Sequence, residues 1–207
     1  MKLYFVRHGE SKLNVLGIHQ NAQTELSAKG IQQAKFVANR FRDIKIDLIV
    51  ASDYLRAQQT AEEIGRSVQK NTVFTPLLRE QKRPTVIEGK QVNDPDVLRI
   101  HEITRNNVKL TDWHFSDEEN FTDLKKRATQ FIEYVNLLTE ENVLAITHGI
   151  ILRMIISLLV FGKGLTFTEF DRFRDVFSMN NTGITLCEKT KDGQWKLITW
   201  NDHAHLG

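Results

Sequence analysis

The sequence predicts an α/β domain of three layers, α/β/α, built on a mostly parallel central sheet. Short apolar runs typical of buried strands alternate with longer segments whose apolar residues recur at helical spacing. Such alternation places helices on both faces of a parallel sheet. The 207 residues show no internal repeat and no linker-like stretch. We therefore expect a single domain over residues 1–207.

The first half of the chain alternates between strand and helix patterns. KLYFV at 2–6 is a short apolar run and predicts a buried strand. Ser27 is a candidate N-cap for a helix whose apolar residues recur from Ile31 to Phe41. DLIVAS at 47–52 predicts a second strand, apolar residues from Ala57 to Val68 mark a second helix, and TVFT at 72–75 predicts a third strand.

Residues 76–115 follow neither periodicity. They contain all three prolines and many charges, with one helix expected near Asp96 to Asn106. We interpret this segment as an excursion over the active face, and residues 81–115 as the loops that decide specificity.

Regular patterns return after this segment. Ser116 and Glu119 have capping-box spacing ahead of a long apolar stripe that runs from Phe121 to Leu138. NVLAIT at 142–147 predicts a strand, and the apolar run 150–161 is too short to span a membrane and predicts a buried helix. GITLCEK and WKLITW, separated by the turn-like KDG, predict a closing hairpin.

Composition excludes several classes of protein. The net charge of +2 gives no bulk attraction to nucleic acid or to an anionic membrane, so neither is an expected partner. The single cysteine, Cys187, permits no disulfide framework, fits a reducing compartment and is expected to be a packed residue. The first residues lack the features of a signal peptide, and we expect a cytoplasmic protein.

Polar side chains gather where the predicted strands end. In sheets of this kind, ligands bind beyond the carboxyl ends of the strands. Four strands deliver two histidines, arginines and an acid to this edge: Arg7, His8, Gly9 and Glu10 from the first, Arg56 from the second, Glu80 from the third, and His148 and Gly149 from the strand at 142–147.

This set of residues suits phosphoryl transfer. Arg7 and Arg56 could clamp a phosphate dianion through paired hydrogen bonds and would lower the pKa of nearby histidines. A neutral imidazole is a nucleophile, and Glu80 could protonate a leaving oxygen and later activate water. The second histidine could stabilise charge on the transferred group, and Gly149 leaves the backbone open to an anion.

Metal binding is the competing use of this set. His8 and Glu10 with His148 could form a histidine–carboxylate site. However, the adjacent arginines would repel a divalent cation, and the chain has no HExxH or CxxC spacing. We therefore expect neither a metal ion nor another cofactor.

Four segments in order, LYFVRHGES, LSAKGIQQA, SDYLRAQQTA and LAITHG, resemble the histidine phosphatase superfamily in its phosphoglycerate mutase-like branch, from Leu3 to about Arg153. The resemblance implies a phosphoglycerate mutase-like fold and a phosphohistidine mechanism. His8 matches the nucleophile of the family. The other matches are Arg7, Arg56 and His148 in the phosphate pocket, Glu80 as proton donor, and Asn14 and Gln20 at polar positions that touch phosphate or substrate.

Two features depart from the mutase pattern. The segment REQKRPTVIEGK does not look like the substrate loop of the mutases, and its Glu88 rivals Glu80 as the proton donor. Thr147 stands where many members of the family have serine.

The resulting prediction is a phosphomonoesterase that acts through a phosphohistidine on a small phosphorylated metabolite. A cofactor-dependent phosphoglycerate mutase is the alternative within enzymes, and a non-catalytic phospho-ligand binding module is the alternative from another class. The sequence leaves the substrate and the oligomeric state open, with a homodimer as one option.

Several charged residues keep two interpretations at this stage. Lys82, Arg83 and Lys90 either bind a second anionic group of the substrate or form a solvated charge run. Glu10 is expected to orient its neighbours at a helix start. Among the other histidines, His19 is a substrate contact or a surface residue, His101 and His114 are expected to be solvated, and His203 and His205 lie in a tail where disorder is expected.

Overall fold

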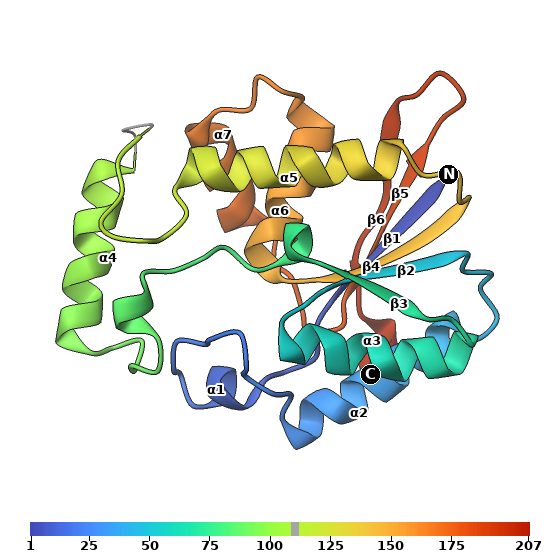
Figure 1. Ribbon diagram of the computed structural model, residues 1–207, viewed down its shortest axis with the longest axis horizontal. Coiled ribbons are helices and arrows are strands. Elements are labelled where there is room, and N and C mark those ends of the chain that lie inside the picture. Colours follow the sequence, from blue (N-terminus) through green and yellow to red (C-terminus); the bar gives the residue numbers. More distant parts are fainter. Residues whose placement is uncertain (109–111) are drawn as a thin grey trace.

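The computed structural model describes residues 1–108 and 112–207. Within them a six-stranded sheet has the order β3-β2-β4-β1-β5-β6 (Figure 1). Strands β1 to β4 run parallel, and β5 and β6 form the predicted antiparallel hairpin. The strands are β1 (Lys2–Arg7), β2 (Leu48–Ser52), β3 (Thr72–Thr75), β4 (Asn142–Thr147), β5 (Ile184–Lys189) and β6 (Trp195–Asp202).

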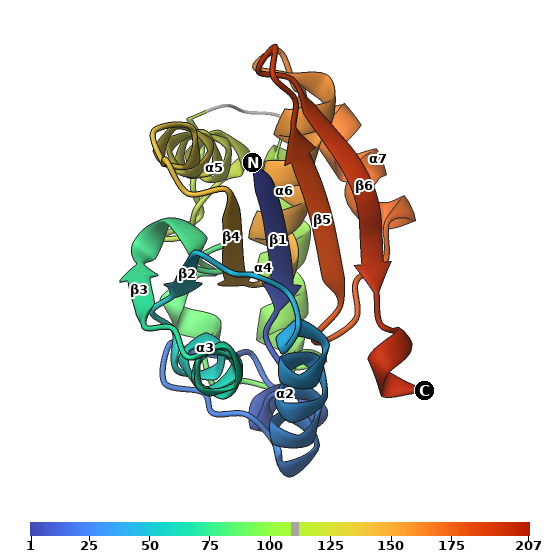
Figure 2. The same ribbon diagram turned by 90° about the vertical axis from the view of Figure 1, so that its right-hand side faces the viewer.

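Helices cover both faces of the sheet, which confirms the predicted three-layer α/β/α class. Figure 2 shows α2 (Ala28–Phe41) and α3 (Leu55–Val68) on one face, with α5 (Phe121–Asn136), α6 (Gly149–Phe161) and α7 (Phe167–Val176) on the other. Every strand predicted from the sequence is present within one residue of its expected bounds, except that β6 extends two residues further, to Asp202.

The alternation of side chains along the strands separates two cores. In β1, Leu3 and Phe5 pack into the cluster with α5 and α6, whereas Tyr4 and Val6 pack into the cluster with α2 and α3. Successive strand residues point to opposite faces, and each face here carries apolar side chains only because helices cover both. This explains why β1 appears in the sequence as a continuous apolar run.

The topology brings distant segments to one edge of the sheet. Arg7 pairs with Thr147 at the carboxyl ends of the parallel strands β1 and β4. Because β5 runs antiparallel to β1, its beginning lies at this same edge, with Val6 opposite Ile184. Residues that precede β5 therefore reach the candidate site, which the sequence did not predict.

The excursion after β3 forms a flank beyond this edge. The helix expected near Asp96 to Asn106 is confirmed as α4 (Pro95–Asn107), and it lies with α1 (Lys12–Val15) at the left of Figure 1. Ile87, Val97 and Ile100 form a small core that holds α4 to the preceding loop. Positions 109–111 of the predicted specificity segment lie outside the described residues.

Two expectations for local structure are wrong. Asn120, not Ser116, caps α5, and Asp123 completes the capping box, while the Ser116 amide donates to Glu118. Helices α1 and α7 were not predicted from the sequence. The tail with His203 and His205 forms a short 3-10 helix at Ala204–Leu206, and His205 Nε2 lies 3.0 Å from the Thr182 hydroxyl.

A close backbone approach joins α2 to the loop after β1. A Cβ placed on Gly30 would lie 1.9 Å from the carbonyl oxygen of Glu10, and a Cβ on Gly9 would lie 2.5 Å from that of Gly30. Neither position can hold a side chain unless the backbone moves. The two glycines therefore set the distance between α2 and the His8 loop.

We predict that Gly30→Ala destabilises the fold and displaces this loop. The expected loss is about 1–3 kcal/mol, since overpacked sites force backbone shifts, although alanine intrinsically favours a helix. Urea unfolding measures this loss. Gly164→Ala is the matched control because nothing lies within 4 Å of its Cβ position, and its stability should stay close to that of the wild type. Equal stability of the two variants would contradict the role of Gly30.

Candidate active site

His8 is buried at the carboxyl end of β1, and its hydrogen bonds define its tautomer. Its Nδ1 lies 2.7 Å from the Gly9 carbonyl, which can only accept, so Nδ1 carries the hydrogen. Arg56 Nε donates to His8 Nε2 at 3.3 Å, which places the lone pair on Nε2. The backbone of the loop is held by Gly9 N–H donating to the Thr60 hydroxyl at 3.1 Å.

The surroundings of His8 favour the neutral imidazole. Burial lowers its pKa well below the usual value, and the Arg56 and Arg7 charges lower it further. Sequence reasoning anticipated the effect of the cations, but desolvation is the larger cause. Nε2 is consequently an unprotonated nitrogen at neutral pH.

Two arginines adjoin His8 from different elements. Arg56, at the start of α3, also donates from Nη1 to the Asn21 carbonyl at 3.0 Å, and burial lowers its pKa to about 10. Arg7 donates from Nη1 to the Met179 carbonyl at 2.6 Å, while its buried Nε has no hydrogen-bond partner in the described structure. An unsatisfied buried donor is costly and marks a place where a ligand oxygen fits.

His148 faces His8 from the end of β4. Their ring centroids are 4.9 Å apart, and burial and then Arg56 lower the pKa of His148 well below its usual value. Its Nε2 lies 2.8 Å from the Ser52 hydroxyl, and its buried Nδ1 has no partner among the described residues. A second unsatisfied nitrogen thus accompanies Arg7 Nε at this edge.

Glu80 is anchored at the amino end of α6. Its Oε1 accepts from the amides of Ile150 at 3.0 Å, Ile151 at 3.2 Å and Gln81 at 2.9 Å. Within the described residues its Oε2 accepts from Ile150 alone, at 3.2 Å, and keeps capacity for another partner. A carboxylate fits this position because the first amides of a helix have no partner within the helix.

Gly149 keeps the space between these groups open. A Cβ at Gly149 would lie 3.7 Å from Arg7 Nε, 3.7 Å from Glu80 Oε2 and 3.4 Å from Arg153 Nη1. The absence of a side chain there leaves room in front of the arginine and the carboxylate. Arg7, His8, Arg56, Glu80, His148 and Gly149 are therefore brought to one edge, as the sequence predicted.

A cavity of about 160 Å³ opens beside this cluster, and Gln20, Arg56, Glu80 and Glu88 are among its lining residues. Gln20 accepts from the Ser11 hydroxyl at 2.7 Å and borders the cavity. Asn14 does not line it and is exposed on α1. The phosphate-binding roles of Gln20 and Asn14 stay predictions.

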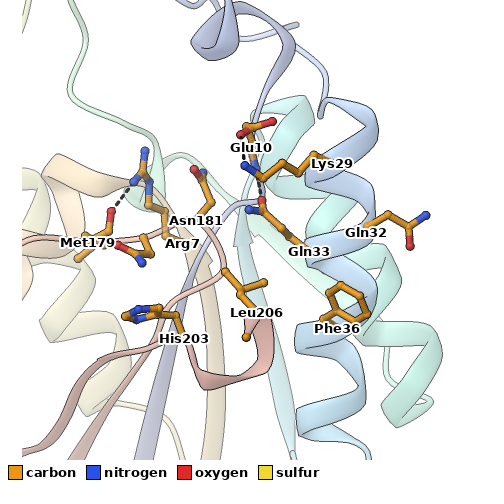
Figure 3. Close-up of a pocket in the computed structure, with 12 residues that line it drawn as sticks. Arg7, Glu10, Lys29, Gln32, Gln33, Phe36, Met179, Asn181, His203 and Leu206 are labelled. Carbon is orange, nitrogen blue, oxygen red and sulfur yellow. Dashed lines mark hydrogen bonds and ion pairs between the residues drawn. The ribbon is translucent and has the colours of Figure 1, made fainter.

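A larger cavity of about 670 Å³ lies between α2 and the C-terminal segment (Figure 3). Arg7 borders it, but Figure 3 shows its guanidinium pointing away from His203 toward Met179. Glu10 faces this cavity, accepts from the Ser27 hydroxyl at 2.8 Å and pairs with Lys29 at 3.2 Å. As expected, Glu10 orients neighbours at the start of α2.

Three contributors to the site were not predicted as functional residues. Ser52 contacts His148, and Asn181 Nδ2 donates to the His8 carbonyl at 2.9 Å. Arg153 donates from Nε to the Phe177 carbonyl at 2.8 Å. Ser52 could have been found from its place at a strand end, whereas Asn181 depends on the pairing of β5 with β1.

The other histidines and Cys187 occupy varied environments. His114 is exposed and contacts Asp123 at 2.6 Å, as a solvated residue can. The expectation for His101 is wrong, because its half-buried ring stacks near that of His19 with centroids 5.3 Å apart. Cys187 is a packed residue as predicted, and burial raises its pKa to about 12.

This site and fold define an enzyme class that transfers phosphoryl groups through histidine. Residues 3–203 match the histidine phosphatase superfamily, branch 1, and the chain belongs to that family. This finding confirms the predicted family and supports a phosphoric monoester hydrolase that acts through phosphohistidine on small phosphorylated metabolites.

Relatives carry both phosphatase and mutase names. A protein of Hydrogenobacter thermophilus with a phosphoserine phosphatase name is 31% identical over 89% of this chain and 87% of its own length. A protein of Enterobacter sp. (strain 638) with a phosphoglycerate mutase name is 33% identical over 77% of this chain and 75% of its own length. The structure of Bacillus stearothermophilus YhfR has a TM-score of 0.85 at 24% identity, covering 100% of this chain and 99% of that one, which confirms the fold.

Within residues 1–108 and 112–207, no helix has the length and apolar character that crossing a membrane requires. The same residues include no group of three or more histidine, cysteine, aspartate or glutamate side chains placed to hold a metal ion.

We predict that His8 stays neutral, with its hydrogen on Nδ1, well below pH 6.5. Nitrogen chemical shifts of the imidazoles in a pH titration measure this. His114 is the control, because its bond to Asp123 raises its pKa. Folding lowers the pKa of His8 below its usual value of 6.5. The stability that this group contributes is therefore fully present above pH 6.5 and is lost as the pH falls toward the pKa of the folded state. An ordinary titration of His8 near 6.5 would contradict this assignment.

Proposed function

We propose that this chain hydrolyses phosphomonoesters with His8 Nε2 as the nucleophile and Glu80 as the general acid. One observation carries the proposal. A neutral, buried imidazole presents its Nε2 lone pair beside two buried nitrogens, Arg7 Nε and His148 Nδ1, that have no partner in the described structure. A tetrahedral phosphoryl group bound there would supply oxygens for both.

In the first half-reaction, His8 Nε2 attacks phosphorus and the ester P–O bond breaks. The Nδ1 hydrogen bond to the Gly9 carbonyl stabilises the cation that forms on the imidazole. Arg7 and Arg56 hold the phosphoryl oxygens, as positioning and electrostatics dominate phosphoryl transfer. Glu80 Oε2 delivers a proton to the leaving oxygen.

His148 acts as a hydrogen-bond donor in this scheme. The Ser52 hydroxyl accepts from the Tyr54 amide at 3.2 Å and lies 2.8 Å from His148 Nε2, so it can donate its own hydrogen to that nitrogen. In this tautomer the ring hydrogen of His148 is on Nδ1, the buried nitrogen without a partner in the described structure, and is available to a phosphoryl oxygen. Its lowered pKa keeps it a neutral donor, so it does not repel the arginines.

In the second half-reaction, water replaces the departed alcohol. Glu80, now a carboxylate, removes a proton from this water, which attacks the phosphorus of phospho-His8 and regenerates the imidazole. The same side chain thus acts as acid and then as base.

The phosphoglycerate mutase alternative returns the phosphoryl group to the substrate rather than to water. Incubation with monophosphoglycerates, with and without a bisphosphoglycerate primer, separates the two activities. A phospho-ligand binding module would use the arginines but would gain nothing from an activated Nε2.

The proposal also includes a cytoplasmic location, which the single free cysteine supports.

We predict an acid-labile, base-stable phosphoenzyme on His8. Brief reaction with a radiolabelled phosphate ester and quenching in base should leave label on this histidine. His8→Ala should carry no label and lose on the order of 10³-fold or more in turnover. His114→Ala, which removes an exposed histidine, should behave as wild type. Label on no histidine, or turnover by His8→Ala, would contradict the mechanism.

We predict that Glu80→Gln discriminates between leaving groups. Alkyl phosphates need protonation and should slow by about 10²-fold or more, whereas aryl phosphates with good leaving groups should slow far less. Steady-state rates on a matched series of esters measure the difference. Glu88→Gln is the comparison, because Glu88 lines the same cavity but is exposed. If Glu88→Gln shows the leaving-group dependence instead, the acid role belongs to Glu88.

A further inference from the structure

The segment that carries Glu80 has no regular structure of its own to hold it. The short 3-10 helix before it ends at Leu78, so the backbone carbonyls that follow need partners from elsewhere in the chain or from water. The four carbonyls of residues 77–80 all accept hydrogen bonds from side chains of other elements. The Leu78 carbonyl accepts from the Thr147 hydroxyl at 2.9 Å, and the other three accept from Arg127.

Arg127, on α5, spans this segment with one guanidinium group. Its Nη1 donates to the Leu77 carbonyl at 3.1 Å and to the Arg79 carbonyl at 2.7 Å. Its Nη2 donates to the carbonyl of Glu80 itself, at 3.3 Å. A guanidinium suits this arrangement, because its planar fork presents several donors in fixed directions. The backbone around Glu80 is therefore tied to α5.

Glu119 completes the hydrogen bonding of Arg127 and holds the other side of Glu80. Arg127 donates from Nε to Glu119 Oε1 at 2.7 Å and from Nη2 to Oε2 at 2.6 Å, so all five N–H groups of the guanidinium are used. The Gln81 side chain donates to the Glu119 carbonyl, and the Lys82 amide donates to Glu119 Oε2, both at 2.9 Å. The two side chains of the ion pair are only 14% and 20% exposed, which limits its screening by solvent ions.

Two different helices thus hold the two parts of Glu80. The amides of Ile150 and Ile151 at the start of α6 bind its carboxylate, whereas Arg127 on α5 binds its backbone. A general acid must lie within hydrogen-bond reach of the oxygen that it protonates. A misplacement of about 1 Å can cost on the order of 10²-fold in rate. The bonds from Arg127 therefore limit how far the carboxylate can move from its working position.

We propose that Arg127 is the positioning residue for the general acid and that Glu119 holds it in this role. This inference rests on the proposed function, in which Glu80 protonates the leaving oxygen. Arg127 does not line the cavity beside Glu80, so it acts on the ester through Glu80. A variant of Arg127 should therefore reproduce part of the Glu80→Gln defect, including its dependence on the leaving group.

Arg127→Lys tests this role, because lysine keeps the positive charge beside Glu119 but lacks the planar fork that reaches the carbonyls. On alkyl phosphates, kcat/KM should fall by about tenfold or more. On aryl phosphates it should stay within about twofold of the wild type, because their leaving groups need little protonation. Steady-state rates on one matched series of esters measure both. A purely structural role would slow the two kinds of ester equally.

A double-mutant cycle with Glu80→Gln identifies the route of the effect. If Arg127 acts through Glu80, adding Arg127→Lys to Glu80→Gln should cause no further loss on alkyl phosphates. Val135→Ala is the control, because it removes buried packing from the same helix but no hydrogen bond. It should lower the midpoint of urea unfolding and keep the wild-type ratio of alkyl to aryl rates.

Three results would overturn the proposal: unchanged rates in Arg127→Lys, equal slowing of both kinds of ester, or independent losses in the double variant. If Arg127→Lys does not fold, Glu119→Gln carries the same test, because it keeps the size of the side chain and removes its charge. Failure of the proposed function looks different. In that case the wild type would not turn over aryl phosphates, or Glu80→Gln itself would show no dependence on the leaving group.

Discussion

The hydrogen bond between His8 Nδ1 and the Gly9 carbonyl is the constraint on which the site depends. It fixes the hydrogen on Nδ1 and leaves the Nε2 lone pair for attack. The bond requires the loop after β1 to hold one backbone path, which Gly30, Thr60 and Asn181 impose from three other elements. The proposed nucleophile is thus defined by the backbone around it as much as by its own side chain.

The mixed sheet explains how one edge collects so many partners. Because β1, β2 and β4 are parallel, their carboxyl ends lie side by side at this edge. Strand β5 runs antiparallel to β1, so its amino end lies at the same edge. Two kinds of element therefore begin at this edge. Helix α6 begins there, and its free amides hold Glu80. Strand β5 also begins there, and the residues before it include Asn181. A wholly parallel sheet would place every strand start at the opposite edge, so the antiparallel β5 is needed to bring Asn181 to this one.

Local patterns were sufficient for the strands, for all α-helices but α1 and α7, and for the residues at strand ends. Buried strands flanked by helices need apolar residues on both faces, so β1 and β4 were visible as continuous runs, and His8 and His148 followed from their ends. The N-cap of α5 was misplaced, because Ser116 and Asn120 both fit a capping pattern and the competing bond to Glu118 is decided by the folded loop.

Long-range pairing was invisible in the sequence for a different reason. The contact of Asn181 with His8 depends on which strand β5 joins, and the pairing of Lys82 with Asp117 depends on how the loop before α5 returns. Residues close in sequence gave no sign of either. The same limitation left Lys82, Arg83 and Lys90 equivalent until the folded chain showed which of them is paired.

The electrostatics of the site link its resting state to its chemistry. The arginines and burial keep His8 neutral while the pocket holds no anion, so the lone pair is available when a substrate arrives. A bound phosphate dianion then offsets the arginine charges, which favours the imidazolium-like cation that forms on His8 as the P–N bond is made. In the proposed mechanism the phosphoryl group stays in the pocket through both half-reactions, so the arginines remain engaged until inorganic phosphate leaves. In the proposed mechanism, one arrangement of charge therefore activates the nucleophile, stabilises the intermediate and retains it for hydrolysis.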